Sequence, residues 1–333
     1  PPPPPFSPPR PPPTSTLRRS RRQRQMCIRD RLSALNQHRR TVATTTSVAR
    51  PSEMPKTSIL QSAASEEDVS QLPPGDEVTN AWGTHWLRRC PLNEVWPQGE
   101  QWLSRSRAQL EQQRYRLLSR SSELSTFVRN LPDGVIYLDL ETCGFSGSMV
   151  FLVGLIHWHD ARFQLSQLMA RNYAEEKAML QTLWSLIAEN RVLVTFNGKS
   201  FDWPMVHDRS TLHHLGFDRR SQPHKHVSES VSSHTINKEA LSSNHPRPEL
   251  IHCDLLHHSR RRWKDRLPDC KLQTLERYVL RRRRTGDIPG REIPAAYHDF
   301  VRTGDAWLMR SVLHHNALDL ITLLQLSLLL LMK

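Results

Sequence analysis

The pattern of apolar and polar residues changes near residue 134. From there, apolar runs of strand length alternate with stretches in which apolar residues recur every three or four positions. The runs that predict strands are 134–141, 149–159, 162–170 and 191–196, followed by a short strand or a strand-to-helix junction at 249–256. Helical patterns cover 174–190, the stretch beginning near Ser200, 270–280 and 307–331. Three antiparallel strands, a crossover helix, a fourth strand and flanking helices predict a mixed α/β sheet.

The first 133 residues have weaker patterns. Residues 1–31 are rich in Pro and Arg, and Met26–Arg31 resembles a translated sequencing adaptor. We therefore interpret 1–31 as a non-biological tail, with a natural disordered tail as the alternative. Residues 32–78 are rich in Ser, Thr, Gln and Glu and predict a disordered linker. Residues 79–133 contain four tryptophans and a helical pattern, which predict a small N-terminal appendage packed on the main domain.

The main domain is expected to cover 134–333, with an exposed polar insertion near 217–248 that is rich in His and Ser. The histidines of this insertion lack the spacing of metal ligands, and we interpret them as part of a solvated loop. The last apolar stretch, 320–333, is too short to span a bilayer and is interrupted by Gln325 and Ser327, so it predicts a buried helix and no membrane partner. Because the sequence stops inside this helix, we expect a truncated C-terminus.

The net charge and the cysteine content exclude few classes of function. The formal net charge is +13, but residues 1–50 hold eleven of the 46 Lys and Arg residues and one acid, Asp30. The bulk basicity therefore belongs to the tail and says little about the folded part. The five cysteines are scattered and form no Cys-x-x-Cys pair, which favours reduced thiols and a cytoplasmic location over a disulfide framework or a zinc site.

The clearest chemical signal is "VIYLDLE", an apolar run that ends in Asp139 and Glu141. Residues i and i+2 of a strand point to the same face, so both carboxylates project together from the end of a core strand. Two adjacent negative charges are costly unless a cation lies between them, and a divalent metal ion is the obvious candidate.

Two further stretches add acids to this pair. In "FNGKSFDWP", a strand ends, Asn197 and a glycine form a turn, and Asp202 lies in the first turn of a helix. Asn197 can hold either substrate or the turn. In "LHHNALDL", His315 precedes Asp319 by four residues and shares its helix face, whereas His314 points away.

Four acids on three separate elements suit phosphodiester hydrolysis by two metal ions. One ion activates water and the other stabilises the leaving oxygen, with the ions about 3.5–4 Å apart. Carboxylates supply the hard oxygen ligands that Mg²⁺ or Mn²⁺ prefers, and a nearby His could orient or deprotonate the water.

The quoted motifs, together with "IHCDLLHHSRRRWKDRLPDCKLQTLE" and "GDIPGREIPAAYHDFVRTGD", resemble the YprB-type ribonuclease H-like family, within the DEDD (DnaQ-like) 3′–5′ exonuclease superfamily. The resemblance covers about 134–326. It implies a ribonuclease H-like sheet flanked by helices. It also implies a set of four metal ligands, Asp139, Glu141, Asp202 and Asp319.

The resemblance leaves the water-activating residue open, because His315 has the spacing of the Tyr in one branch of the superfamily and His314 that of the His in the other. We favour His315 on helix geometry.

The partner expected from these motifs is nucleic acid, single-stranded or with 3′ ends. Basic residues around Trp263 are candidate phosphate contacts: Arg260, Arg261 and Lys264. The run at 281–284, four arginines, is a second basic cluster. Asp254 is either a fifth acid near the site or a helix cap. The competing functions are a non-catalytic nucleic-acid-binding module with a vestigial metal site, and an endonuclease of the ribonuclease H type.

Overall fold

The computed structural model describes residues 70–118, 122–144, 147–215 and 250–332. The predictions for 1–31, for most of 32–78 and for the insertion at 217–248 lie outside these described residues.

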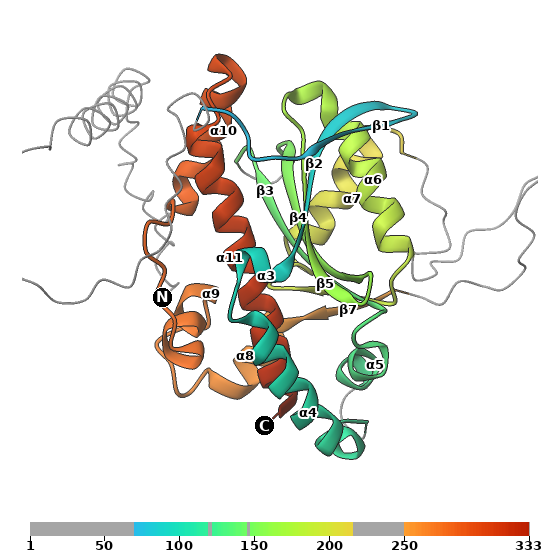
Figure 1. The fold of residues 1–333 in the computed structure, drawn as a ribbon, viewed down its shortest axis with the longest axis vertical. Coiled ribbons are helices and arrows are strands. Elements are labelled where there is room, and N and C mark those ends of the chain that lie inside the picture. Colours follow the sequence, from blue (N-terminus) through green and yellow to red (C-terminus); the bar gives the residue numbers. More distant parts are fainter. Residues whose placement is uncertain (1–69, 119–121, 145–146, 216–249, 333) are drawn as a thin grey trace, which may run out of the picture. The chain divides into compact units, whose positions relative to one another are not determined.

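The described residues form one mixed sheet of seven strands, in the order β1-β2-β5-β4-β3-β6-β7 (Figure 1). Neighbours from β1 to β3 in this order are antiparallel, whereas β6 lies parallel to β3 and β7 parallel to β6. The bounds are β1 Asp76–Asn80, β2 Gly83–Pro91, β3 Val135–Thr142, β4 Val150–His159, β5 Arg162–Met169, β6 Val192–Thr195 and β7 Ile251–Asp254. The predicted mixed α/β sheet is therefore present, and each strand predicted after residue 134 is found within a few residues.

β1 and β2 were not predicted. They come from the stretch interpreted as a linker and an appendage, yet β2 pairs with β5 and extends the main sheet. The expected boundary at residue 79 falls inside β1. The strand pattern is weak here because β1 is an exposed edge strand and β2 carries two arginines, so neither has a long apolar run.

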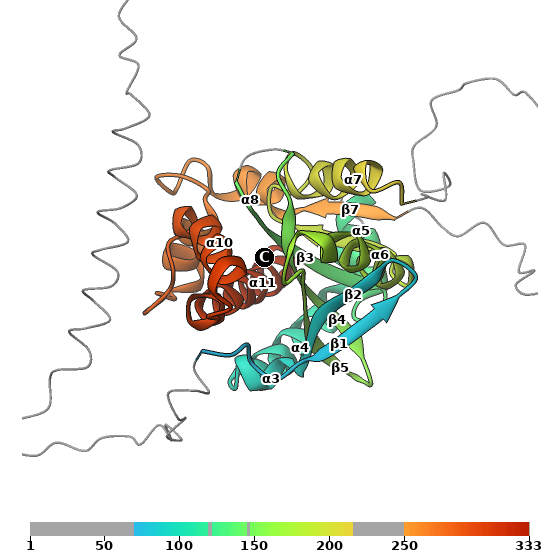
Figure 2. The same cartoon turned by 90° about the horizontal axis from the view of Figure 1, so that it is seen from above.

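Helices cover both faces of the sheet. Figures 1 and 2 show α10 and α11 on one side, with α6 and α7 on the other. On the α11 side, Phe127 of α5 meets the buried ring of Tyr137 edge to face. The bounds are α3 Leu92–Val95, α4 Gly99–Leu118, α5 Ser122–Asn130, α6 Glu176–Ala188, α7 Asp202–Leu212, α8 Leu255–Trp263, α9 Leu272–Leu275, α10 Ile293–Thr303 and α11 Trp307–Met332. Glu276–Leu280 continues α9 as a π-helical turn.

α11 is the central helix of the fold. It is long and apolar enough to cross a membrane by composition, with a mean hydropathy of 1.5 over its most apolar window, but 72% of that window is buried inside the protein. A helix that is apolar on nearly all sides is suited to a core position in a soluble domain as well as to a membrane. Its burial agrees with the core helix predicted from the sequence.

α11 approaches the sheet closely where Asn316 meets Gly154. A Cβ atom at Gly154 would lie 2.0 Å from Asn316 Oδ1. Gly154 pairs with Asp139 on β3 and with Gln167 on β5, so the three residues form a row under the helix. Asn316 is fully buried, donates to Asp139 Oδ2 at 2.9 Å, and accepts from Gln167 at 3.1 Å. This row sets the position of α11 over the end of β3.

We expect Gly154→Ala to lower the free energy of unfolding by about 1–3 kcal/mol, because the added methyl group overpacks a buried contact. Denaturant titration followed by circular dichroism measures the effect. Gly290→Ala is the control, since a Cβ there meets open space. A loss of stability in both variants alike would contradict the role of the close approach.

Candidate functional site

β3 presents the first two acids at its end. Asp139 and Glu141 lie on the strand face that meets α11, as their alternation predicted. Directly after Glu141 the pairing with β4 shifts, because Leu152 opposes Glu141 while Val150 opposes Thr142. A bulge of this kind bends a strand and redirects side chains, and bulges are frequent beside active sites.

The turn between β6 and α7 places Asp202, which is buried at the first residue of α7. Asn197 adopts a left-handed backbone conformation in this turn, with φ of 64°. Asp254 holds the turn: its carboxylate accepts hydrogen bonds from the backbone of Asn197 at 2.8 Å and of Lys199 at 3.1 Å. It also caps α8 by accepting from Leu256 at 3.0 Å. Asp254 is therefore the helix cap, and it also lies near the site, because its charge helps to raise the pKa of Asp202.

α11 supplies Asp319 and His315. His315 is buried, and its Nε2 atom lies 3.5 Å from Asp319 Oδ2. Its other ring nitrogen, Nδ1, lies 2.8 Å from Asp287 Oδ1. His314 is exposed. The side chain that faces the acids is thus the one that helix geometry favoured.

The four acids, here called the carboxylate cluster (Asp139, Glu141, Asp202 and Asp319), lie close together: the charges of the other three all raise the pKa of Asp139. Burial and the charge of Asp319 raise the pKa of Asp139 well above its usual range. The same two causes raise the pKa of Glu141. Burial raises the pKa of Asp202 to about 7, against hydrogen bonds from its own backbone amide and that of Leu140.

The pKa of Asp319 is also raised by burial, while Arg284 opposes the shift. Arg284 donates to Asp319 and, through its other atoms, to Glu276 at 2.7 Å and Asp287 at 3.1 Å. One arginine therefore offsets part of the negative charge. The remaining excess of hard oxygen donors fits one or more divalent cations.

Three residues of this site escaped the sequence analysis. Asn316 stands inside the quoted "HHNALDL", but an amide between apolar residues carries no signal for a bond to Asp139. Asp287 was quoted only within the motif that begins at Gly286 and was given no role, and Arg284 was one of four arginines in the second basic cluster. Their roles depend on the path of the chain from Glu276 to Ile293, which brings Arg284 and Asp287 against residues of α11 that lie 35 and 28 positions later in the sequence.

The predicted substrate contacts are dispersed. Asn197 is exposed next to Asp202 and shapes the turn through its backbone. Arg260, Arg261 and Lys264 are exposed on or just after α8, and Arg261 donates to His258 Nδ1 at 2.7 Å. None of the three makes a hydrogen bond or ion pair to the carboxylate cluster among the contacts of the described residues.

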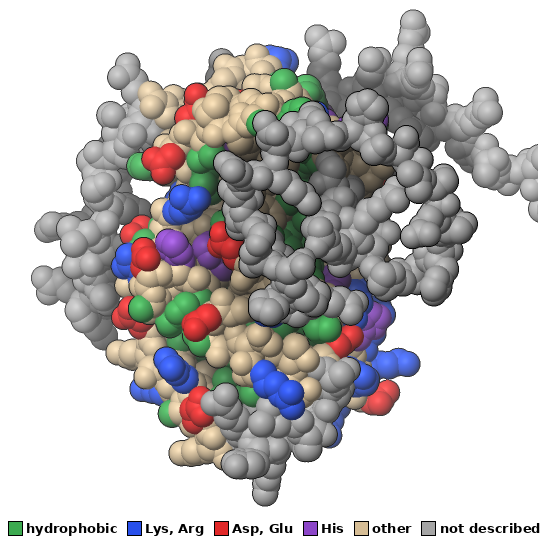
Figure 3. Space-filling view, turned by 90° about the vertical axis from the view of Figure 1, so that its right-hand side faces the viewer, with side chains coloured by type: hydrophobic (Ala, Val, Ile, Leu, Met, Phe, Trp, Pro, Cys, Tyr) green, Lys and Arg blue, Asp and Glu red, His purple; other side chains and the backbone are tan. Residues whose placement is uncertain are grey.

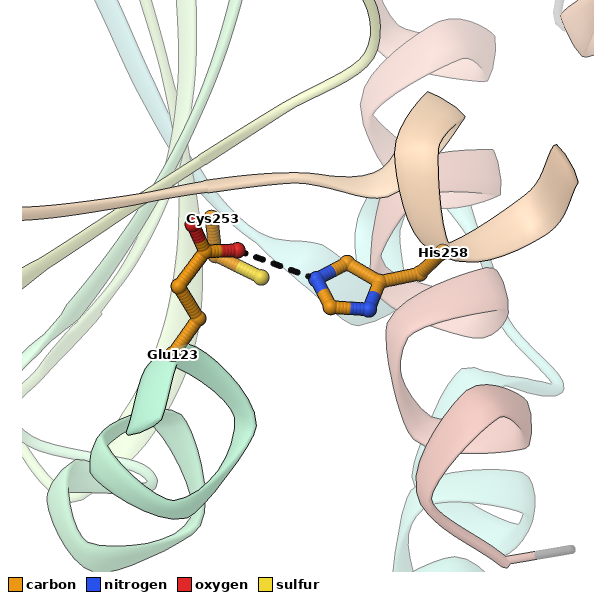
Figure 4. Close-up of side chains that lie close together, drawn as sticks. All are labelled: Glu123, Cys253 and His258. Atoms are coloured by element: carbon orange, nitrogen blue, oxygen red, sulfur yellow. Dashed lines mark hydrogen bonds and ion pairs between the residues drawn. The ribbon is translucent and has the colours of Figure 1, made fainter. Parts of the chain in front are cut away.

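A second group of metal-ligand types lies apart from the carboxylate cluster. The ligand atoms of Glu123, Cys253 and His258 all lie within 4.8 Å of one another (Figure 4). Hydrogen bonds already satisfy this group: Arg261 donates to His258 Nδ1, so Nε2 carries the proton that faces Glu123 at 3.1 Å. Lys199 also donates to Glu123 at 2.6 Å.

Burial raises the pKa of the Cys253 thiol to about 12, which keeps it protonated and a poor metal ligand. We therefore assign the group to the packing of α5 against β7 and α8.

The raised pKa of Asp202 predicts a pH-dependent stability. The pKa of Asp202 is 3.8 in its ordinary state and about 7 in the folded protein. Ionising this carboxyl group therefore destabilises the folded state, and at low pH, where the group is protonated, the folded state does not bear this cost. Without metal, we expect Asp202→Asn and the wild type to have similar Tm near pH 4, and the variant to gain several degrees over the wild type as the pH rises from about 4 to about 7.

Differential scanning calorimetry at pH 4 and 8 measures this difference. At pH 8, Mn²⁺ should raise the Tm of the wild type more than that of the variant, because the carboxylate is both the source of repulsion and a ligand. A Tm difference that does not change with pH would contradict the assigned cause.

Comparison with known proteins places this site in a family. YprB of Bacillus subtilis (strain 168), an uncharacterized protein, is 31% identical over 197 residues, which are 58% of this chain and 41% of YprB. The chain thus spans about two fifths of the length of this curated relative. A family B DNA polymerase from the hyperthermophilic archaeon Pyrobaculum calidifontis aligns with a TM-score of 0.41 and 13% identity, over 58% of this chain and 24% of the polymerase. The sequence profile of the RNase_H superfamily matches residues 136–331, more than half of the chain and all of the carboxylate cluster, so the chain belongs to the RNase_H superfamily.

Proposed function

We propose that this protein is a metal-dependent nuclease that hydrolyses phosphodiester bonds of DNA or RNA from the 3′ end. The observation that carries the proposal is the gathering of four carboxylates from β3, α7 and α11 beside a buried histidine, where burial and the charges of the other three acids raise the pKa of Asp139. Structural acids are normally paired with cations or exposed, whereas a mutually repelling, partly accessible group is typical of a cation site.

The donor set fits two ions of Mg²⁺ or Mn²⁺. Asp139, Glu141 and Asp319 would hold one, and Asp139 with Asp202 the other. When bound, the ions would lower the pKa of the attacking water and stabilise the leaving oxygen.

His315 would take the proton from the attacking water. Asp287 accepts from Nδ1, so in the neutral ring Nδ1 carries the proton and Nε2 has a free lone pair on the side of Asp319. Asp287 is held in turn by Arg284. The chain therefore fixes both the direction and the tautomer of the ring that would act as the base.

The activity test uses the full chain with single-stranded DNA and RNA labelled at either end, in Mg²⁺, Mn²⁺ or EDTA. We expect metal-dependent, stepwise shortening from the 3′ end by the wild type. Asp139→Asn should lose at least about 100-fold in rate, since it removes a carboxylate shared by both ions. Glu189→Gln, an exposed acid at the end of α6, is the charge-matched control and should keep full activity.

The products separate the competing functions. Internal cuts in the RNA strand of an RNA–DNA hybrid would show an endonuclease of the ribonuclease H type and contradict the exonuclease proposal. Binding without cleavage of any strand would contradict both nuclease functions and favour a nucleic-acid-binding module whose metal site is vestigial.

The role of Asp287 gives a separate prediction. We expect Asp287→Ala to lower kcat by about 10- to 100-fold with KM little changed, because partners that orient a catalytic side chain have effects of this size. His314→Ala, one position from His315 but exposed, should leave kcat unchanged. ¹⁵N NMR of the metal-free protein should show the Nδ1-protonated tautomer for His315 in the wild type; the opposite tautomer would disprove the assignment.

A further inference from the structure

An arginine-rich groove lies next to the carboxylate cluster. The segment from the π-helical turn to Pro289 runs along α11 on the side away from the sheet (Figures 1 and 2). It encloses an open groove of about 470 Å³ whose lining includes four arginines and two acids: Arg277, Arg282, Arg283, Arg284, Glu276 and Asp287. The lining thus carries a net positive charge of two. This volume is in the range of small-molecule binding sites in proteins.

Two of the four arginines form the floor of the groove. Glu276 is buried and accepts hydrogen bonds from both Arg282 and Arg284. Arg282 also donates to Gln325 of α11 at 3.0 Å, and Arg284 to Asp319. Their charges are therefore used within the protein, and they are not free to bind a ligand without breaking buried ion pairs.

The other arginines are available. Arg277 and Arg283 are exposed, and no carboxylate of the described residues forms an ion pair with either. Arg281 has a left-handed backbone conformation, with φ of 55°, at the point where the chain leaves the π-helical turn. Beyond it the chain has no regular secondary structure, and Arg282 and Arg284 are half-buried while Arg281 and Arg283 are exposed.

An exposed aromatic ring stands beside Arg277, next to the residues that line the groove and outside their number. Tyr278 is 50% exposed, and the guanidinium of Arg277 lies 5.4 Å from the centre of its ring. Exposed aromatic rings between arginines are typical of surfaces that bind single-stranded nucleic acid, because bases stack on the ring while cations meet the phosphates. On the opposite side of the molecule, in the view of Figure 3, basic and acidic side chains of the described residues are mixed.

The groove shares two residues with the site. Both Arg284 and Asp287 line the groove; Arg284 donates to Asp319 of the carboxylate cluster, and Asp287 accepts from His315 beside it. A strand in the groove would therefore have its backbone directed to the acids.

We propose that Arg277 and Arg283 bind the phosphate backbone of a single-stranded nucleic acid, with a base stacked on Tyr278, and that this groove leads the strand to the carboxylate cluster. The proposal rests on the proposed function for the direction of the strand, but the binding itself does not depend on catalysis. It differs from the interpretation of Arg260, Arg261 and Lys264 as the substrate contacts, because those residues share no contact with the site.

The test measures binding of fluorescent single-stranded DNA and RNA to the full chain in EDTA, by anisotropy over a range of salt concentrations. We expect Arg277→Gln/Arg283→Gln to weaken binding at least 10-fold and to reduce the slope of log K against log salt by about 1.4, which corresponds to two lost phosphate contacts on a single strand. Arg260→Gln/Lys264→Gln removes the same charge from α8 and is the matched control. The opposite ranking of the two variants would overturn the proposal.

Two further measurements identify the ligand class. Tyr278→Leu should weaken binding of the oligonucleotide several-fold and leave inorganic polyphosphate binding unchanged. Equal binding of duplex and single strand, or no effect of Tyr278→Leu, would reduce the groove to a general anion site and overturn the assignment to single strands.

The outcomes also separate this proposal from the proposed function. If Arg277→Gln/Arg283→Gln, the groove variant, loses binding and the wild type cleaves no strand in Mn²⁺, the binding proposal holds and the proposed nuclease activity is wrong. Cleavage with an unchanged KM in the groove variant would retain the nuclease and reject the groove.

Discussion

The close approach of α11 to the sheet is the contact on which the site depends. Asn316 can reach Asp139 only because the neighbouring position on β4 is Gly154, where any side chain would occupy the same space. Once this contact sets the position of the helix, Asp319 and His315, on the same side of α11, come to the end of β3. The buried side-chain amide of Asn316 thus joins the packing of α11 on Gly154 to the placement of Asp139 in the candidate site.

Concentrating four carboxylates at one place opposes folding, and the surrounding structure offsets part of that cost. Arg284 lies against Asp319 and is itself held by Glu276 and Asp287. Asp254 fixes the turn before Asp202 by accepting hydrogen bonds from two backbone amides of that turn, those of Asn197 and Lys199. Burial and the charges of neighbouring acids raise the pKa of the four carboxyl groups, and a divalent cation would offset both effects.

The sequence predicted most reliably those relations that join residues within a few positions of each other. Asp139 and Glu141 share a face because of strand alternation, and His315 precedes Asp319 by one helical turn; both relations hold for any fold that contains these elements. β1 and β2 were missed because an exposed edge strand needs little apolar sequence when a long neighbouring strand supplies its hydrogen bonds. The arginine run at 281–284 was predicted as one basic cluster, yet its side chains alternate between ion pairs inside the protein and solvent.

By itself, the sequence determined the order of elements after residue 134, the apolar core strands, the buried C-terminal helix and the identity of the four acids. Only the tertiary structure decided that Asn316, Asp287 and Arg284 join them, that Asp254 is a cap, and that the two basic stretches differ in their relation to the site. The physical reason is that periodicity is set by neighbours within a few residues, whereas these contacts join β3, α11 and the segment before α10 across 28 to 177 positions.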